Sequence, residues 1–173
     1  MPPRFLPVAD RAVMVEFAPA IDAAAHRAVL ALDAALAARP FPGFAEAVPA
    51  FVSLMVVFDP LETDHAAVEA HLRRLISAST ETVLQPRTHR VEVTYDGPDL
   101  AEVAERTGLS PADVAVAHQA GDYEVAMYGF APGYAYLSGL PAAIGLDRKP
   151  APVRNVPAGT VIIAGGMCLV TTL

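Results

Sequence analysis

Apolar and polar positions alternate with two different periods along the first part of the chain. Strand-like apolar runs fall at residues 4–8, 12–17, 44–48 and 51–58. Two helix-like segments, 21–38 and one capped by Thr63, carry an apolar stripe along one face. The first stripe comprises Ile21, Ala25, Val29, Leu32 and Leu36, and the second comprises Val68, Leu72, Leu75 and Ile76. This pattern predicts a strand–helix–strand–helix domain over residues 1–80.

A polar, proline-terminated stretch at 77–86 predicts a linker to a second domain over residues 88–173. Two helices are expected there, one starting at Asp96-Gly97-Pro98 and one at Ser110-Pro111. The expected strands cover residues 90–95, 123–128, 153–156, 160–164 and 168–173. Because the last strand ends without a polar cap, we expect either a missing C-terminal tail or a partner that covers this edge.

Residues 129–141 form the least regular and most informative stretch. They contain three glycines, two prolines and three aromatic residues, which disfavours both a helix and a regular strand. The aromatic residues also make the stretch too apolar for a solvated linker. We therefore expect an ordered loop over a groove, of the kind that carries function on a rigid scaffold. The alternative is a buried, well-packed turn.

Composition excludes several classes of function. The chain has 173 residues, is 54% apolar and has a net charge of −7, so nucleic-acid binding is not expected. The expected helix pair at 100–118 has the spacing of a DNA-binding helix-turn-helix. Its second helix carries no Lys or Arg to contact phosphates, so DNA binding is not expected. A single cysteine, Cys168, excludes an internal disulfide and a cysteine-based zinc site. With no apolar run long enough for a membrane span and no apolar signal-peptide core, a cytoplasmic location is expected.

Two groups of polar side chains are candidates for chemistry. His118 lies at the end of a predicted helix, shortly before the aromatic loop, and could act as a general base, a charge anchor or a surface cap. The other helical histidines, His26, His65 and His71, are expected to be solvated. No histidine pair has helical metal-binding spacing, so no metal site is expected.

The second group is cationic. Arg148, Lys149 and Arg154 cluster beside the tight turn at 156–160, which suits anion binding. A basic strand edge that resists aggregation is the alternative. Asp96 and Asp99 are best explained as helix caps.

The motifs together resemble those of a known family. Gly129-Phe130-Ala131-Pro132-Gly133, followed by residues 136–141 and by Val156-Pro157-Ala158-Gly159-Thr160-Val161, is similar to the signature of the 5-oxoprolinase B subunit. Residues 9–17, 95–100 and 108–110 fit the same family, which is also known as allophanate hydrolase subunit 1 and as the kinase inhibitor KipI. The chain departs from the family pattern at 134–135, 153 and 167–169, which leaves the substrate open.

The resemblance implies an α+β fold, in which a small α/β sandwich is followed by a cyclophilin-like β-barrel that this chain leaves incomplete at its C-terminus. It implies one component of an ATP-dependent, multi-subunit enzyme that hydrolyses 5-oxoproline to glutamate. Its partners would be a homologous C subunit, the sister of this chain, and possibly an A subunit. ATP, with Mg²⁺, would bind at a site shared with the sister subunit. The other possibility is a KipI-like inhibitor of a sensor histidine kinase.

On this hypothesis His118 transfers protons in a site that is incomplete without the sister subunit. The remaining candidate residues bind ATP or a small lactam or amide. They are Phe130, Gly133, Tyr134, Tyr136, Arg148, Lys149, Arg154 and Gly159.

Overall fold

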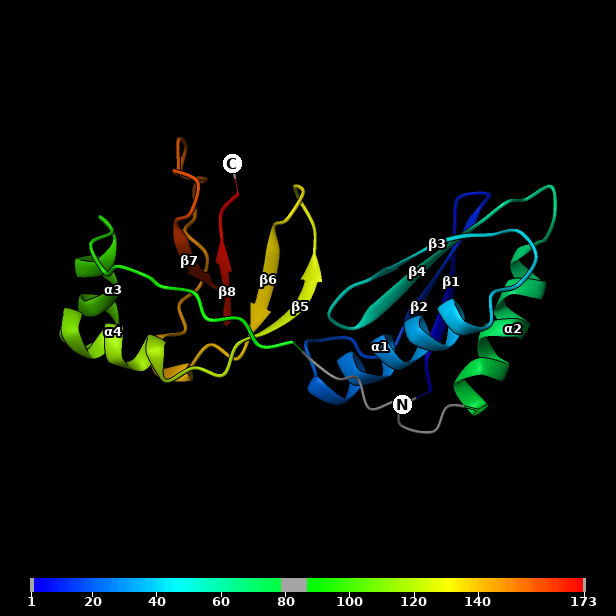
Figure 1. The fold of residues 1–173 in the computed structure, drawn as a ribbon, viewed down its shortest axis with the longest axis horizontal. Helices are drawn as coiled ribbons and strands as arrows, with labels where there is room; N and C mark the ends of the chain where they lie inside the picture. Colours follow the sequence, from blue (N-terminus) through cyan, green and yellow to red (C-terminus); the bar gives the residue numbers. More distant parts are fainter. Residues whose placement is uncertain (1, 79–86, 173) are drawn as a thin grey trace. The chain divides into compact units, whose positions relative to one another are not determined.

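The protein is described here by a computed structural model covering residues 2–78 and 87–172, which divide into two compact units (Figure 1). The first unit is Met1–Arg87 and the second is Thr88–Leu173. Each unit has its own antiparallel sheet and two α-helices, so the chain has a mixed α/β fold. The expected linker at 77–86 lies mostly outside the described residues. None of the described helices has the length and apolar character needed to cross a membrane.

The sheet of the first unit has the strand order β1-β2-β4-β3. Its strands are Arg4–Val8 (β1), Ala12–Glu16 (β2), Phe44–Pro49 (β3) and Ser53–Phe58 (β4). All neighbouring strands are antiparallel. The alternation in the sequence therefore predicts these four strands to within a few residues at their ends.

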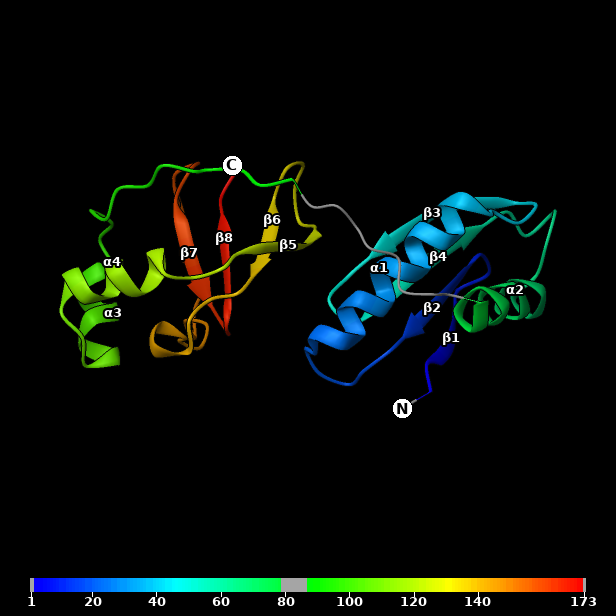
Figure 2. The same cartoon turned by 60° about the horizontal axis from the view of Figure 1, so that its bottom comes forward.

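Two helices pack on one face of this sheet. They are α1 (Ala23–Ala38) and α2 (His65–Ala78). The predicted stripes are buried in a core that they share with alternate residues of β2 and β4, which puts both helices on the same face (Figure 2). Ile76 is partly buried against this core, as expected.

The starts of these helices differ from the prediction at two residues. Ile21 lies before α1 and is 61% exposed, so it does not belong to the buried stripe. The cap of α2 is Asp64 and not Thr63, because the Asp64 carboxylate accepts the N–H of Ala67 at 2.8 Å. Asp22 caps α1 in the same way, accepting the N–H of Ala25 at 2.7 Å.

The sheet of the second unit has the order β5-β6-β8-β7. Its strands are Glu124–Tyr128 (β5), Ala135–Ser138 (β6), Val161–Ala164 (β7) and Met167–Val170 (β8). Among the described residues this sheet is open, with β5 and β7 at its edges. The expected cyclophilin-like barrel is therefore not confirmed.

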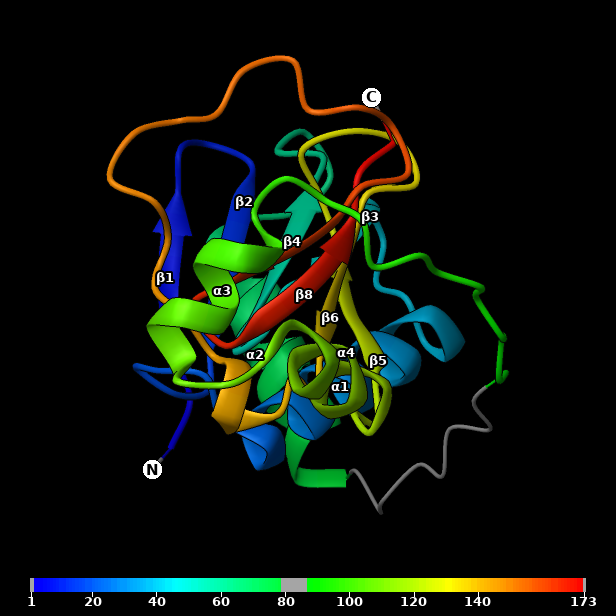
Figure 3. The ribbon, with the colours of Figure 1, turned by 90° about the vertical axis from the view of Figure 1, so that its left-hand side faces the viewer.

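Helices α3 (Leu100–Thr107) and α4 (Pro111–Gln119) lie side by side (Figure 3). Ser110 begins α4 by accepting the N–H of Asp113 at 3.1 Å. The pair packs on Ile144, which belongs to a short 3-10 helix at Ala142–Ile144.

Three expectations for the second unit are wrong. Residues 90–95 alternate in polarity but pair with no described strand, so the pattern alone does not make a strand. Residues 153–156 are also irregular, and Asn155 has a φ of +57°, which interrupts an extended backbone. Conversely, β6 lies inside the stretch expected to exclude strands. The glycines and prolines flank its four residues, which pair with both β5 and β8.

Candidate functional site

The connection between β5 and β6 contains two successive tight turns. The N–H of Ala131 donates to the carbonyl of Gly129 at 2.8 Å, and Phe130 between them has a φ of +66°. A hydrogen bond between residues i and i+2 around a positive φ defines a γ-turn, which is rare and strained for a residue with a side chain. Phe130 is therefore held in a conformation that it would not adopt alone.

The second turn covers residues 131–134. The N–H of Tyr134 donates to the carbonyl of Ala131 at 3.0 Å, with Pro132 and Gly133 in the central positions. Gly133 has a φ of +74°, as the third position of a type II turn requires. The N–H of Gly129 also donates to the carbonyl of Tyr134 at 3.1 Å. This bond closes the loop, so the sequence of breakers encodes an ordered structure.

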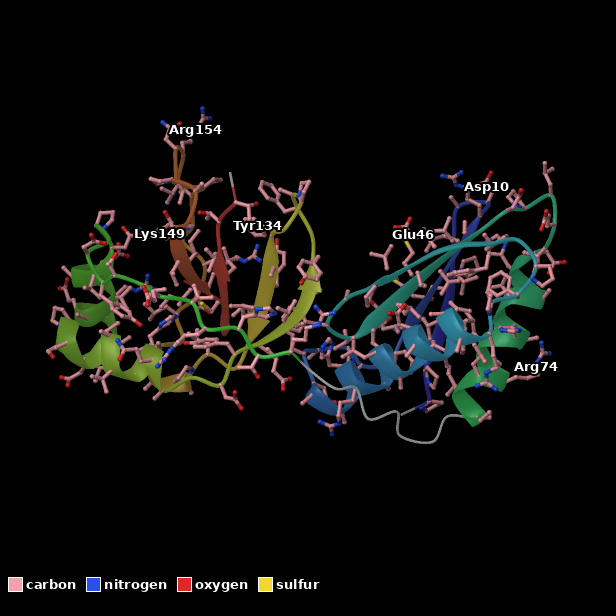
Figure 4. The ribbon with its side chains drawn as sticks, viewed as in Figure 1. Asp10, Glu46, Arg74, Tyr134, Lys149 and Arg154 are labelled. Atoms are coloured by element: carbon pink, nitrogen blue, oxygen red, sulfur yellow. The ribbon has the colours of Figure 1, made fainter. Side chains whose placement is uncertain are left out.

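The structure brings the three predicted aromatic residues together. The ring centroids of Phe130 and Tyr134 are 5.2 Å apart, and those of Tyr134 and Tyr136 are 5.4 Å apart. Burial raises the pKa of Tyr134 and Tyr136 adds to this, whereas the nearby charge of Arg148 lowers it. Tyr134 lies at the end of the sheet where β5 is connected to β6 (Figure 4). At pH 7 the Tyr134 hydroxyl is therefore uncharged.

Another tight turn, Pro157–Thr160, is held by Thr171, which sequence analysis missed. The Thr171 hydroxyl donates to the carbonyl of Pro157 at 2.6 Å and accepts the N–H of Thr160 at 3.0 Å. The Thr171 carbonyl accepts the N–H of Gly159 at 2.7 Å. Thr171 is 7% exposed, so these bonds satisfy a buried hydroxyl. A lone threonine near the end of an apolar strand gave no signal of this role.

The two predicted loops meet at the same end of the sheet. A Cβ atom added at Gly133, in the first loop, would lie 3.7 Å from the methyl group of Thr172. The neighbouring residue, Thr171, accepts a hydrogen bond from the N–H of Gly159 in the second loop. The N–H of Gly159 is occupied by this bond and is not available to a ligand. Within the described residues, the N–H of Gly133 has no acceptor and can donate to one.

The three predicted cations do not share one location. The ammonium of Lys149 lies 2.9 Å from a carboxylate oxygen of Asp99 and 3.1 Å from one of Glu102, and these hydrogen bonds raise its pKa. Lys149 would have to leave both carboxylates before it could bind an anion. The positive charge of Arg148 is close enough to Tyr134 to lower the pKa of its hydroxyl. Arg154 is exposed and has no acidic partner among the described residues (Figure 4). Arg148 is therefore the cation best placed beside the aromatic loop.

His118 lies where the end of α4 meets β8. Its Nδ1 is 2.8 Å from the Tyr95 hydroxyl, and its Nε2 is 3.4 Å from the sulfur of Cys168. The Tyr123 hydroxyl donates to the backbone carbonyl of His118 at 2.9 Å, and both tyrosine rings pack against the imidazole. Both ring nitrogens therefore have a side-chain partner, and the tautomer of the imidazole sets which of the two nitrogens donates. These partners also were not identified from the sequence.

Burial controls the ionisation of this cluster. Desolvation lowers the pKa of His118, and it raises the pKa of Cys168 to about 11 and of Tyr123 to about 12. His118 is therefore neutral at pH 7, and Cys168 is a protonated thiol and not a nucleophile. The protonated imidazole would donate from both nitrogens, to the Tyr95 oxygen and toward the Cys168 sulfur, but burial disfavours that charged form.

Three other histidines are packed and not simply solvated, contrary to expectation. His65 and His71 contact the rings of Phe58 and Phe41, with centroids 5.0 and 5.4 Å apart. His26 Nδ1 lies 3.2 Å from the carbonyl of Phe51. In the part of the chain that the structure describes, no group of three His, Cys, Asp or Glu residues could hold a metal ion.

Taken together, the described residues place two tight loops at one end of the antiparallel sheet in the second unit. Comparison with known proteins gives the family. Residues 3–173 match the family described as carboxyltransferase domain, subdomain C and D, and the chain belongs to this family and to that of the 5-oxoprolinase B subunit.

Two of the relatives that this chain matches are 5-oxoprolinase B subunits. The chain is 37% identical to the 5-oxoprolinase B subunit of Bacillus subtilis (strain 168), over 90% of this chain and 71% of that protein. It is 31% identical to the 5-oxoprolinase B subunit of Escherichia coli O157:H7, over 91% of this chain and 73% of that protein.

Solved structures support the fold. The crystal structure of TTHA0988 matches 93% of this chain with a TM-score of 0.80 and 36% identity. The chain spans only 32% of the TTHA0988 chain. The crystal structure of the K. lactis urea amidolyase matches 97% of this chain with a TM-score of 0.69, and the match covers 12% of the amidolyase chain. Because the sequence identity is only 16%, this match indicates a shared fold alone.

Proposed function

We propose that this chain is part of one subunit of an ATP-dependent amidohydrolase of the 5-oxoprolinase type. The observation that carries the proposal is its 37% identity to the 5-oxoprolinase B subunit over 90% of the chain. In the proposed assembly it acts in the cytoplasm with its sister, a homologous C subunit, and possibly with an A subunit. The substrate is 5-oxoproline or a related small lactam or amide. The sheet of the second unit is proposed to belong to a cyclophilin-like barrel.

The chemistry requires ATP because an unstrained lactam is stabilised by amide resonance. Transfer of the terminal phosphoryl group from ATP to the carbonyl oxygen converts that oxygen into a leaving group. ADP leaves at this step, and water then attacks the carbon. The ring C–N bond breaks, with its electron pair and a proton going to nitrogen, and a second water hydrolyses the resulting acyl phosphate to the free carboxylate and phosphate. Such a site needs cations and N–H donors for the phosphates and for the substrate carboxylate.

The residues at the aromatic loop fit part of this requirement. Arg148 and the N–H of Gly133 supply a cation and a donor, and Phe130 and Tyr134 supply an apolar wall. Lys149 would contribute after release from Asp99 and Glu102. Mg²⁺ commonly keeps several waters and binds through the nucleotide phosphates, so it does not need a cage built by this chain alone.

The described residues do not form a complete set of a nucleophile and a base. His118 uses both ring nitrogens, and Cys168 is buried with a raised pKa. These contacts favour an active site that is completed by the sister subunit. Proton transfer between His118 and a substrate would require one ring nitrogen to exchange its present partner, Tyr95 or Cys168, for the substrate when the complex assembles.

The test is co-expression of the chain with its sister subunit, followed by measurement of ATP-dependent glutamate release from 5-oxoproline. The complex should turn over and the purified chain alone should show little or no activity. Robust turnover by the chain alone would contradict a shared site. An inactive complex that instead inhibits autophosphorylation of a sensor histidine kinase would favour the KipI-like function.

A further inference from the structure

The ring of Phe130 is both exposed and conformationally constrained. Its exposed fraction is 83%, so burial in the core does not explain a phenylalanine here. Its positive φ is unfavourable for a residue with a side chain, and the γ-turn hydrogen bond between Gly129 and Ala131 maintains it. Backbone strain of this kind is concentrated at ligand-binding and catalytic sites. An exposed ring on a strained backbone therefore favours a role in binding.

The surroundings of the ring favour a flat ligand. Tyr134 packs against it with a centroid distance of 5.2 Å and an interplanar angle of 60°, and Tyr136 contacts Tyr134 in turn, with centroids 5.4 Å apart. With Tyr134 on one side and most of its surface open to solvent, Phe130 presents an accessible aromatic surface. Nucleotide bases stack on such surfaces because every base has a π-face.

Two polar groups close to this loop suit phosphate. Arg148 is close enough to Tyr134 for its charge to lower the pKa of the phenol. The N–H of Gly133 lacks an acceptor among the described residues and lies in the turn that follows Phe130. A cation and a free amide beside an aromatic ring match a ligand with a planar base at one end and phosphates at the other.

We propose that Phe130 is the platform on which the purine base of a nucleoside triphosphate stacks, with the phosphates directed toward Arg148 and the Gly133 N–H. This inference rests on the proposed function, which makes ATP a substrate, and it assigns the part of this chain that recognises the base. The γ-turn fixes the backbone from which the ring projects, so binding does not have to order this part of the loop.

Fluorescence gives a direct test because the sequence contains no tryptophan. The Phe130→Trp variant is assembled with the sister subunit, and the emission of the wild-type complex is subtracted to isolate the introduced indole. ATP and adenosine should both change this emission saturably, because both carry the base. Inorganic tripolyphosphate should not. Leu61→Trp, at a residue that is 93% exposed in the other unit, controls for collisional quenching and should respond to none of the three.

Binding measurements on side-chain variants of the complex complete the test. Phe130→Ala should raise the Kd for ATP and for adenosine about tenfold, in line with the loss of one stacked base. Phe130→Tyr keeps the aromatic face and should bind both nearly as the wild type does. Neither substitution should alter the affinity for tripolyphosphate. Equal adenosine affinities in all three proteins would overturn the proposal.

The outcomes separate this inference from the proposed function. ATP-dependent turnover with an indole that does not respond to adenosine would overturn base stacking and leave the hydrolase function intact. A response to adenosine without turnover would support stacking and count against the hydrolase function. If the emission changes only on addition of the sister subunit, Phe130 lies in the interface with that partner and the stacking proposal is wrong.

Discussion

The hydroxyl of Thr171 donates a hydrogen bond to the carbonyl of Pro157 at a distance of 2.6 Å. This bond joins the end of β8 to the turn at residues 157–160, and it is made by a buried side chain.

Thr171→Val keeps the shape of the side chain but leaves the N–H of Thr160 without its side-chain acceptor. We expect the free energy of unfolding of the second unit to fall by about 1–2 kcal/mol in urea denaturation. Thr172→Val, at an exposed neighbour, should change it by less than about 0.5 kcal/mol. Equal effects of the two substitutions would show that the Thr171 bonds contribute little.

At Phe130 we expect a substitution to leave the free energy of unfolding unchanged or to raise it. Phe130→Gly removes a side chain from a residue with a φ of +66°, and the ring lost is 83% exposed. Because glycine adopts positive φ without strain, the protein should be as stable as the wild type or more stable by about 1 kcal/mol. Phe130→Ala removes the ring but keeps the strain, so it should be less stable than the glycine variant. A glycine variant clearly less stable than the alanine variant would mean that no strain is present.

The cluster around His118 predicts a pH dependence. Burial lowers the pKa of His118 in the folded state, so the unfolded chain binds more protons just below pH 6.5 and stability falls as the pH falls through this range. His118→Gln loses contacts to Tyr95 and Cys168 and should reduce the free energy of unfolding by about 1–2 kcal/mol at pH 8. The difference from the wild type should shrink by pH 5, where keeping His118 neutral costs the wild type stability. Denaturation curves at both pH values test this, and a difference that grows toward pH 5 would contradict a neutral, buried imidazole.

Lys149 is the only lysine in the sequence, which makes its reactivity measurable. Its contacts with Asp99 and Glu102 raise its pKa, so less free amine is present at a given pH. The double variant Asp99→Asn, Glu102→Gln should therefore be acylated faster at Lys149 than the wild type at pH 8, as followed by mass spectrometry of the peptide. The N-terminal amine of the same protein serves as the internal control. Equal rates at Lys149 in both proteins would show that the ion pairs do not persist in solution.

Local patterns in the sequence predict the first unit well because its strands and helices each combine a clear period with recognisable ends. The second unit is harder because its structure depends on contacts between distant residues. Residues 90–95 have the alternation of a strand but no described partner, whereas β6 is a strand because β5 and β8 pair with it.

The candidate site shows the same distinction. The sequence identifies the aromatic loop and the turn near Gly159 from their glycines and prolines. It does not show that Thr171 holds the turn, or that His118 meets Tyr95 and Cys168, which are 23 and 50 residues away. Nor does it show that Lys149 pairs with Glu102 of α3 and with Asp99, whose side chain makes no capping hydrogen bond to that helix, contrary to expectation. These relationships arise only when the chain folds.

The most direct test of the proposed function is the steady-state kinetics of ATP-dependent 5-oxoproline hydrolysis by the complex assembled from this chain and its sister subunit. The Arg148→Ala complex should show a KM for ATP or for 5-oxoproline raised about tenfold or more, because a charge-assisted contact to an anion is lost. The Arg27→Ala complex, altered at an exposed cation of α1, should match the wild type. Wild-type kinetics in the Arg148→Ala complex would contradict the assignment of the anion site to the aromatic loop.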